Sequence, residues 1–286
     1  MLSCSSFFRS SSDLLEDTIL LYKRVTEQYK DEKILAVVKS LIPDNVILQT
    51  KKEDEDNIVS ILKWFKNDFM KWTPKDPSCE KCFNANDYSS SGGGNRGNGD
   101  VNNIDSSGRS SSAAVVAVLL MQSQVIMGNS WKMRKTEVFK CNNCNYEYAF
   151  PRYAEILKIA EIKRGRCSEW SMLFGAMLNS LDIEARIVHD FLDHCWNEAK
   201  VMPGGKWIHV DSTLTYPISL NHPYYYEGNW GKKYEYVLAF SADKMEDVTQ
   251  RYTQHWETLQ QRRQKKRNSN KKNAKITNLA KFYSDL

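Results

Sequence analysis

Two C-x-x-C pairs constrain the fold of this chain more than any other feature of its sequence. Cys79 and Cys82 form the first pair, and Cys141 and Cys144 form the second. Within each pair a tight turn lets two thiolates reach one ion, and two such pairs have the ligand spacing of a tetrahedral four-cysteine zinc site. A closed set of four thiolates leaves no open coordination position, so we expect one structural Zn²⁺. The alternative is four unrelated thiols in a reducing compartment.

The segment between the two pairs has a composition that does not favour folding. From about residue 84 to residue 112 it consists mainly of Asn, Ser, Gly and Asp. These residues bury too little apolar surface to offset the entropy lost on ordering, so we expect a disordered insert at 84–112. Lengthening a loop adds little closure entropy, so the insert is compatible with one zinc-binding subdomain over about residues 75–150.

Helices followed by short strands predict an α+β fold. Residues 13–40, 57–72 and 167–181 carry apolar side chains at helical spacing. Further along the chain, short β-branched and aromatic segments separated by turns predict an antiparallel sheet of three or four strands. These segments are EARIVHDF, HCWNEAKV, KWIHVDS and YEYVLAFS.

The chain divides into three predicted parts. We expect an N-terminal helical extension over residues 1–45, a core that includes the zinc subdomain over 46–255, and a basic tail over 256–286. The formal net charge is +5, and Lys and Arg are concentrated in the tail. The rest of the chain is therefore close to neutral, and no nucleic-acid partner is expected.

The sequence favours an intracellular protein without a membrane-inserted segment. Its first residues lack the basic region and apolar stretch of a secretory signal, and the longest apolar run is about half the length that a bilayer requires. Seven cysteines is an odd number, which argues against a disulfide framework and favours metal binding and catalysis. We expect a cytoplasmic location, with a nuclear one as an alternative.

Cys167 is the candidate nucleophile. It begins an apolar helix directly after the polar loop KRGR, and a helix N-terminus lowers the pKa of a thiol by stabilising its thiolate. His194 and Asp211 lie in two of the predicted strands. A nucleophile at a helix end, a base on one strand and a carboxylate on the next form a papain-type arrangement. His189 and His209 are equally eligible as the base on composition alone.

The order of motifs along the chain resembles that of the cytoplasmic peptide:N-glycanases, a family of the transglutaminase-like superfamily. The resemblance extends from about residue 57 to residue 252, interrupted by the low-complexity insert. The motifs are ILKWFKNDFMKW, the two C-x-x-C pairs, FPRY, GRCSEWSMLFGAML, DHCWNE, WIHVDS and WGKKYEYVLAFSADKMEDVTQRY.

This resemblance implies a transglutaminase-like core in which Cys167, His194 and Asp211 form the catalytic triad and the paired cysteines bind a structural zinc ion. It implies hydrolysis of the amide that joins Asn to the first N-acetylglucosamine of an N-linked glycan. The implied substrates are misfolded glycoproteins, and the implied partners are shuttle proteins with ubiquitin-like domains and the proteasome pathway.

Two tryptophans are candidate substrate contacts. Trp196 follows the base by two positions, where it would supply an indole N–H or form a wall of the cleft. Trp230 would stack on a sugar ring or pack in the protein. The sequence departs from the family pattern at Ser168, where the family usually has Gly, and at Leu214, where it commonly has a sugar-contacting Glu.

Three other functions remain alternatives. A protein-crosslinking transglutaminase would use the same triad, but the cysteine pairs and the WGKK block argue against it. A DNA-damage-binding relative of the xeroderma pigmentosum group C type would keep the fold without the triad. An inactive module that binds glycans or ubiquitin-pathway proteins is compatible with Leu214.

Overall fold

The computed structural model describes residues 11–47, 54–75, 79, 81–82, 121–128, 130–202 and 205–269. The chain divides into two compact units, which are described separately. Unit 1 comprises 1–73, 129–134 and 152–286, and unit 2 comprises 74–128 and 135–151. The predicted insert and the last part of the predicted tail lie outside the described residues. Among the helices in the described ranges, none combines the length and apolar character needed to cross a bilayer.

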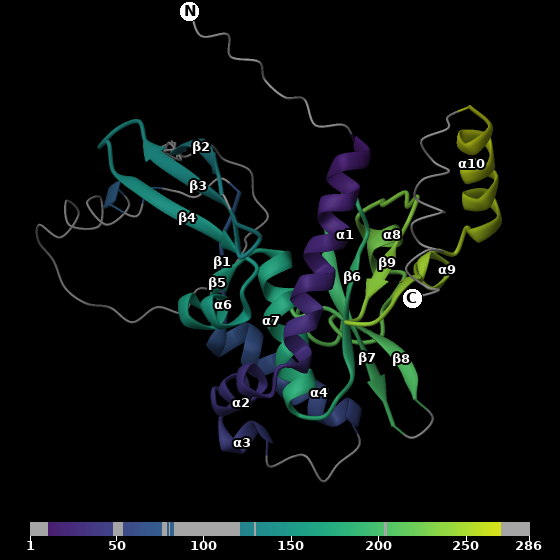
Figure 1. Cartoon of the computed structure of the whole chain (residues 1–286), viewed down its shortest axis with the longest axis horizontal. Coiled ribbons are helices and arrows are strands. Elements are labelled where there is room, and N and C mark those ends of the chain that lie inside the picture. Colours follow the sequence, from purple (N-terminus) through teal and green to yellow (C-terminus); the bar gives the residue numbers. More distant parts are fainter. Residues whose placement is uncertain are drawn as a thin grey trace, which may run out of the picture. The chain divides into compact units, whose positions relative to one another are not determined.

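A five-stranded antiparallel sheet forms the centre of unit 1 (Figure 1). Its strand order is β10-β9-β6-β7-β8. The strands are β6 (Ala185–His189), β7 (Cys195–Val201), β8 (Lys206–Val210), β9 (Leu238–Phe240) and β10 (Met245–Asp247). The four segments predicted from the sequence are β6 to β9, so the α+β prediction is confirmed, and β10 adds a short edge strand.

Helices cover both faces of this sheet. Alternate residues of a strand point to opposite faces, and Ile187 of β6 joins the main core whereas the neighbouring Val188 joins a second cluster. The main core is formed with α1 (Ser11–Glu27), α2 (Glu32–Ser40), α4 (Asp54–Trp64), α6 (Ile156–Ile162) and α7 (Cys167–Ser180). The second cluster is formed with α8 (Tyr225–Asn229), α9 (Thr249–Tyr252) and α10 (Trp256–Ser269).

Two predicted helices differ in extent from the observed ones. The helical pattern over residues 13–40 is divided by the 3-10 turn η1 (Gln28–Lys30) and by Asp31, whose extended backbone and side chain cap α2. The pattern over 57–72 continues after α4 as a π-helical turn η3 (Phe65–Phe69) and ends there. The next residues form β1 (Lys71–Trp72), which pairs with β5 (Arg164–Gly165), so the helix gives way to this pairing.

The short helix α3 (Asp44–Ile47) completes the described helices of the N-terminal region.

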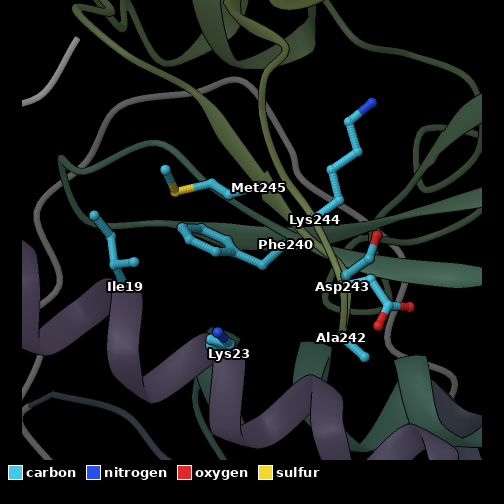
Figure 2. A pocket seen from close by; sticks show the side chains of 8 residues that line it. Ile19, Lys23, Phe240, Ala242, Asp243, Lys244 and Met245 are labelled. Atoms are coloured by element: carbon cyan, nitrogen blue, oxygen red, sulfur yellow. The ribbon is translucent and has the colours of Figure 1, made fainter. Parts of the chain in front are cut away.

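A small hollow lies between α1 and the turn that joins β9 to β10 (Figure 2). Ile19, Phe240 and Met245 provide its apolar side, and Lys244 points away from them. None of the predicted catalytic residues lines this hollow, so it plays no part in the candidate active site.

A three-stranded sheet with the order β2-β3-β4 carries most of unit 2. Its strands are β2 (Met121–Met127), β3 (Met133–Cys141) and β4 (Glu147–Tyr153). Phe139 and Phe150 are buried together with three of the paired cysteines. The turn between β3 and β4 contains Asn145 with a positive φ of 56°, the left-handed conformation that Asn adopts more readily than most residues. This turn is the tight knuckle that the second C-x-x-C pair predicts.

Candidate active site and metal site

The first turn of α7 places Cys167 at the helix N-terminus, with its side chain half-buried. The backbone N–H of Arg166 donates to Glu169 Oε2 at 3.0 Å, and Arg152 Nε donates to Glu169 Oε1 at 2.7 Å. Glu169 has no exposed surface. A Cβ on Gly165 would lie 2.3 Å from Glu169 Cβ, so glycine is required there. These contacts fix the turn that presents the thiol.

His194 and Asp211 form a buried hydrogen-bonded pair. His194 Nε2 lies 2.8 Å from Asp211 Oδ2, which also accepts from the Tyr226 hydroxyl at 2.6 Å. Asp211 Oδ1 accepts from the N–H and the hydroxyl of Thr213 at 2.8 and 2.7 Å. Burial alone would raise the pKa of Asp211, but the charge and hydrogen bond of His194 and the bond from Tyr226 lower it further than burial raises it. Asp211 is therefore a carboxylate whose hydrogen bonds fix its orientation.

The interaction between His194 and Asp211 also shifts the pKa of His194, which rises where that of Asp211 falls. Burial alone would lower the pKa of His194, but the charge and hydrogen bond of Asp211 together with Cys167 raise it to about 10. A hydrogen bond from Cys195 and the contact with His194 hold the pKa of Cys167 well below its usual value. At neutral pH the two side chains are therefore a thiolate and an imidazolium. The structure brings the three predicted triad residues together.

A tight loop positions the backbone of His194. Asp190 Oδ1 accepts from the N–H groups of Leu192, Asp193 and His194 at 2.9, 3.1 and 3.0 Å. Lys232 forms ion pairs with the carboxylates of Asp190 and Asp193. The Asp193 carbonyl oxygen lies 3.7 Å from Cys167 Sγ. The loop therefore positions the candidate base and contacts the candidate nucleophile.

The other two eligible histidines are neutral at pH 7, with His209 buried and His189 half-buried. His209 Nδ1 accepts from the N–H of His222 at 3.3 Å, and His209 Nε2 lies 2.8 Å from the Tyr226 hydroxyl. Since Tyr226 donates to Asp211, it accepts from the Nε2–H of His209. Burial lowers the pKa of His209 and that of His189 to about 4. Neither has the raised pKa of His194, so the geometry favours His194 as the base.

The two candidate substrate tryptophans have different environments. Trp196 has no exposed surface, and its ring packs 4.7 Å from that of Tyr226 and 4.9 Å from that of Tyr252. The Trp196 ring also stacks against the ring of His194, with the two ring centroids 5.8 Å apart. Trp230 is 44% exposed, and its ring lies 5.1 Å from that of His194. Trp230 therefore offers an exposed aromatic face beside the triad.

The sequence did not predict several residues that hold this site. Tyr226 belongs to a run of three tyrosines, and nothing in that run shows which ring faces Asp211. Lys232 lies in the WGKK block, and Asp190 lies four residues before His194 in DFLDH. Asp190 and Lys232 are charged residues inside the quoted motifs, and that position is the sequence feature that could have identified them.

The four paired cysteines form a second cluster, in unit 2. Their sulfur atoms all lie within 4.8 Å of one another. Cys79 Sγ lies 3.6 Å from Cys144 Sγ, and Cys82 Sγ lies 3.7 Å from Cys141 Sγ. Zinc–sulfur bonds of about 2.3 Å in a tetrahedron separate the sulfur atoms by about 3.8 Å. The arrangement therefore fits a single metal ion, as the sequence predicts.

Two family models match the chain. The model described as the transglutaminase-like superfamily matches residues 126–212, and the Rad4 transglutaminase-like domain model matches residues 192–285. The first match includes the three triad residues and the second C-x-x-C pair. A solved structure of Rad4-Rad23 crosslinked to an undamaged DNA covers 85% of this chain and 48% of that chain, with 13% identity and a TM-score of 0.41. A likeness that remote carries no argument about function.

Curated relatives narrow the assignment further. A Caenorhabditis briggsae protein named peptide-N(4)-(N-acetyl-beta-glucosaminyl)asparagine amidase is 30% identical over an alignment of 239 residues, which covers 81% of this chain and 33% of that protein. A Saccharomyces cerevisiae protein of the same name is 33% identical over 196 residues, which are 68% of this chain and 46% of that protein. The chain spans about a third to a half of the length of these relatives.

The fold and the matched models define a member of the transglutaminase-like superfamily. Within that superfamily, the chain belongs to the sequence family of the peptide-N(4)-(N-acetyl-beta-glucosaminyl)asparagine amidases.

Proposed function

We propose that the chain hydrolyses the amide bond between Asn and the first N-acetylglucosamine of an N-linked glycan and converts that Asn to Asp. The observation that carries the proposal is the buried His194–Asp211 pair beside Cys167. Relatives about 30% identical to this chain bear the name of an amidase with this specificity. Denatured N-glycoproteins are the proposed substrates, because a folded glycoprotein would not readily present this bond to a nucleophile at a helix end.

Cys167 acts as the nucleophile in the first half of the reaction. Its thiolate attacks the side-chain carbonyl carbon of the glycosylated Asn, and the carbonyl oxygen becomes an oxyanion. The backbone N–H of Cys167 is the proposed donor to that oxyanion, because the first N–H groups of a helix have no partner within the helix. When the carbon–nitrogen bond breaks, protonated His194 gives its proton to the leaving glycosylamine. A thioester on Cys167 remains.

Water completes the reaction in the second half. Neutral His194 takes a proton from water as the water attacks the thioester. The carbon–sulfur bond then breaks, which releases Asp and restores the thiolate beside the imidazolium. Asp211 stabilises the imidazolium and keeps Nε2 of His194 directed toward itself, so that Nδ1 is left for Cys167.

The exposed ring of Trp230 is the proposed contact for the sugar. An aromatic face stacks on the apolar face of a pyranose, and this ring lies beside His194. Trp196 is proposed to support the ring of His194 and not to contact the sugar, since its side chain has no exposed area. Trp230→Ala should raise KM more than it lowers kcat.

Zinc is the proposed ion of the four-cysteine site, with a structural role. The thiolates of Cys79, Cys82, Cys141 and Cys144 would hold it, and their sulfur separations suit tetrahedral coordination. All four ligands come from the protein, so the ion would hold two distant segments of the chain together and take no part in the amide chemistry.

A cytoplasmic location and two classes of partner complete the proposal. A reactive thiolate and four metal-binding thiols need a compartment that keeps thiols reduced. Besides the glycoprotein substrate, the family resemblance suggests shuttle proteins with ubiquitin-like domains that lead to the proteasome. Subcellular fractionation, followed by affinity capture with a purified ubiquitin-like domain as the probe, tests both.

Deglycosylation of denatured ribonuclease B tests the proposed activity. Wild-type protein should remove the glycan, and Cys167→Ala and His194→Gln should not. His255→Gln is the matched control for the histidine, because His255 is exposed and contacts none of the triad residues. If the folded, zinc-loaded wild type leaves the glycan in place, the amidase proposal fails and a non-catalytic glycan-binding module becomes the better account. Transfer of the acyl group to an added amine instead of water would indicate a transglutaminase.

A further inference from the structure

Cys195 is a buried nucleophilic group that the proposed hydrolysis does not use. It is the first residue of β7 and follows His194 directly. Its side chain is 1% exposed, whereas Cys167 is half-buried and reachable from solvent. In the proposed hydrolysis His194 carries the proton and Asp211 orients its ring, and no proton passes through Cys195.

The contacts of Cys195 place its sulfur beside that of Cys167. Ser171 Oγ donates to Cys195 Sγ at 3.4 Å, and Ser171 lies one helical turn after Cys167 on the same face of α7. From the other side, the carbonyl oxygen of Asp193, two residues before Cys195, lies 3.7 Å from Cys167 Sγ. Both sulfur atoms therefore lie between the first turn of α7 and the start of β7.

The two thiols are not equivalent. A hydrogen bond from Cys195 lowers the pKa of Cys167, together with the contact to His194. Burial and this same hydrogen bond raise the pKa of Cys195. Cys195 thus stays a protonated thiol that donates to the thiolate of Cys167. A half-buried thiolate next to a fully buried thiol is the arrangement of a redox-sensitive cysteine with its resolving partner.

We propose that Cys167 and Cys195 form a reversible disulfide when the protein meets a hydroperoxide. The Cys167 thiolate attacks the outer peroxide oxygen, the oxygen–oxygen bond breaks, and the departing alkoxide or hydroxide takes a proton from His194. Cys167 is then a sulfenic acid. The Cys195 sulfur attacks the Cys167 sulfur, the sulfur–oxygen bond breaks, and the hydroxyl leaves with the Cys195 proton as water. The two thiols together give two electrons to the peroxide.

The disulfide would protect the nucleophile as well as block it. A sulfenic acid that finds no thiol is oxidised further to sulfinic acid, which a dithiol does not reduce. A disulfide returns to two thiols when a dithiol attacks it. Cys195 would therefore make the oxidation of Cys167 recoverable, independently of which substrate the active site takes.

Peptide mapping of the peroxide-treated protein tests this proposal. The full, zinc-loaded chain is treated with hydrogen peroxide, its remaining thiols are blocked with N-ethylmaleimide, and its peptides are analysed by mass spectrometry without reduction. We expect one crosslinked pair of peptides that contains Cys167 and Cys195, with the mass of two hydrogens lost. Dithiothreitol should restore both thiols.

Two substitutions of Cys195 make the test specific. Cys195→Ser keeps the size of the side chain, and Cys195→Val keeps its apolar character. Two variants are used because Cys195 is buried, and the comparison needs only one of them to fold. In either, Cys167 should proceed to sulfinic acid, and dithiothreitol should not recover it. The proposal is overturned if wild-type Cys167 reaches sulfinic acid while Cys195 remains a thiol, or if recovery is the same with and without Cys195.

Discussion

Replacing Asp211 with Asn tests the thiolate–imidazolium pair. The substitution keeps the size of the side chain and removes the charge 2.8 Å from His194 Nε2. Burial then acts on His194 without its counter-charge, and the pKa should fall from about 10 to the ordinary 6.5 or lower. A fall from about 10 to 6.5 corresponds to roughly 5 kcal/mol of lost imidazolium stabilisation. At neutral pH His194 becomes neutral, and the pKa of Cys167 rises.

Alkylation of Cys167 by iodoacetamide measures this effect, because only the thiolate reacts. In the wild type the rate, followed on the Cys167 peptide, should change little between about pH 6 and pH 8. In Asp211→Asn it should fall about ten- to thirty-fold at pH 7 and rise with pH, as expected for a thiol with an ordinary pKa near 8.5. Amidase activity should fall about 10³- to 10⁴-fold.

The matched control is Asp243→Asn, since Asp243 is exposed and pairs with Lys30 away from the triad. It should leave both the alkylation profile and the activity unchanged. If Asp211→Asn folds and keeps the wild-type alkylation profile, Asp211 does not sustain the ion pair, and our account of Cys167 activation is wrong.

Three further predictions concern the surrounding structure. Gly165→Ala places a Cβ 2.3 Å from Glu169 Cβ and should cost about 1–3 kcal/mol of unfolding free energy; an unchanged urea midpoint would refute the packing argument. His189 and His209 have folded pKa values of about 4, below an unfolded value of about 6.5, so stability should fall as pH drops between these values. Denaturant titrations across that window check this, and a flat profile would contradict it. Cys82→Ser should abolish stoichiometric zinc in elemental analysis, whereas full retention would place the metal elsewhere.

The sequence predicted the elements whose side-chain pattern is dominated by burial. The helix that begins at Cys167 is buried along almost its whole length, so its apolar positions marked it clearly, and its N-terminus made Cys167 the candidate nucleophile. The strands β6 to β9 were recognisable because turn residues separate short aromatic and β-branched runs. The C-x-x-C pairs indicated a metal site because ligand spacing is a local property of the sequence.

The remaining features depend on long-range contacts. The helical pattern up to Trp72 did not reveal that residues after Phe69 would leave the helix and pair with β5, because that partner lies far along the chain. The choice of His194 over His209 depends on which one reaches both Asp211 and Cys167, and spacing does not encode this. Helix α10 belongs to the region predicted only as a basic tail, yet its Leu259 is buried in the second cluster.

Side-chain contacts of Arg263 help to explain why α10 packs on the core although its composition is basic. Arg263 Nη1 lies 2.9 Å from Asp247 Oδ2, and its guanidinium lies over the ring of Tyr236. Composition marks such a helix as solvated because most of its residues are charged or polar, whereas a few specific contacts anchor it to the core.

Hydrolysis of a denatured glycopeptide in ¹⁸O-labelled water tests the central claim most directly. The account predicts that the wild type converts the glycosylated Asn to Asp with one ¹⁸O atom incorporated, and that Cys167→Ala leaves the glycopeptide intact. Release of the glycan with a sugar still attached to Asn, or equal conversion by Cys167→Ala, would contradict it.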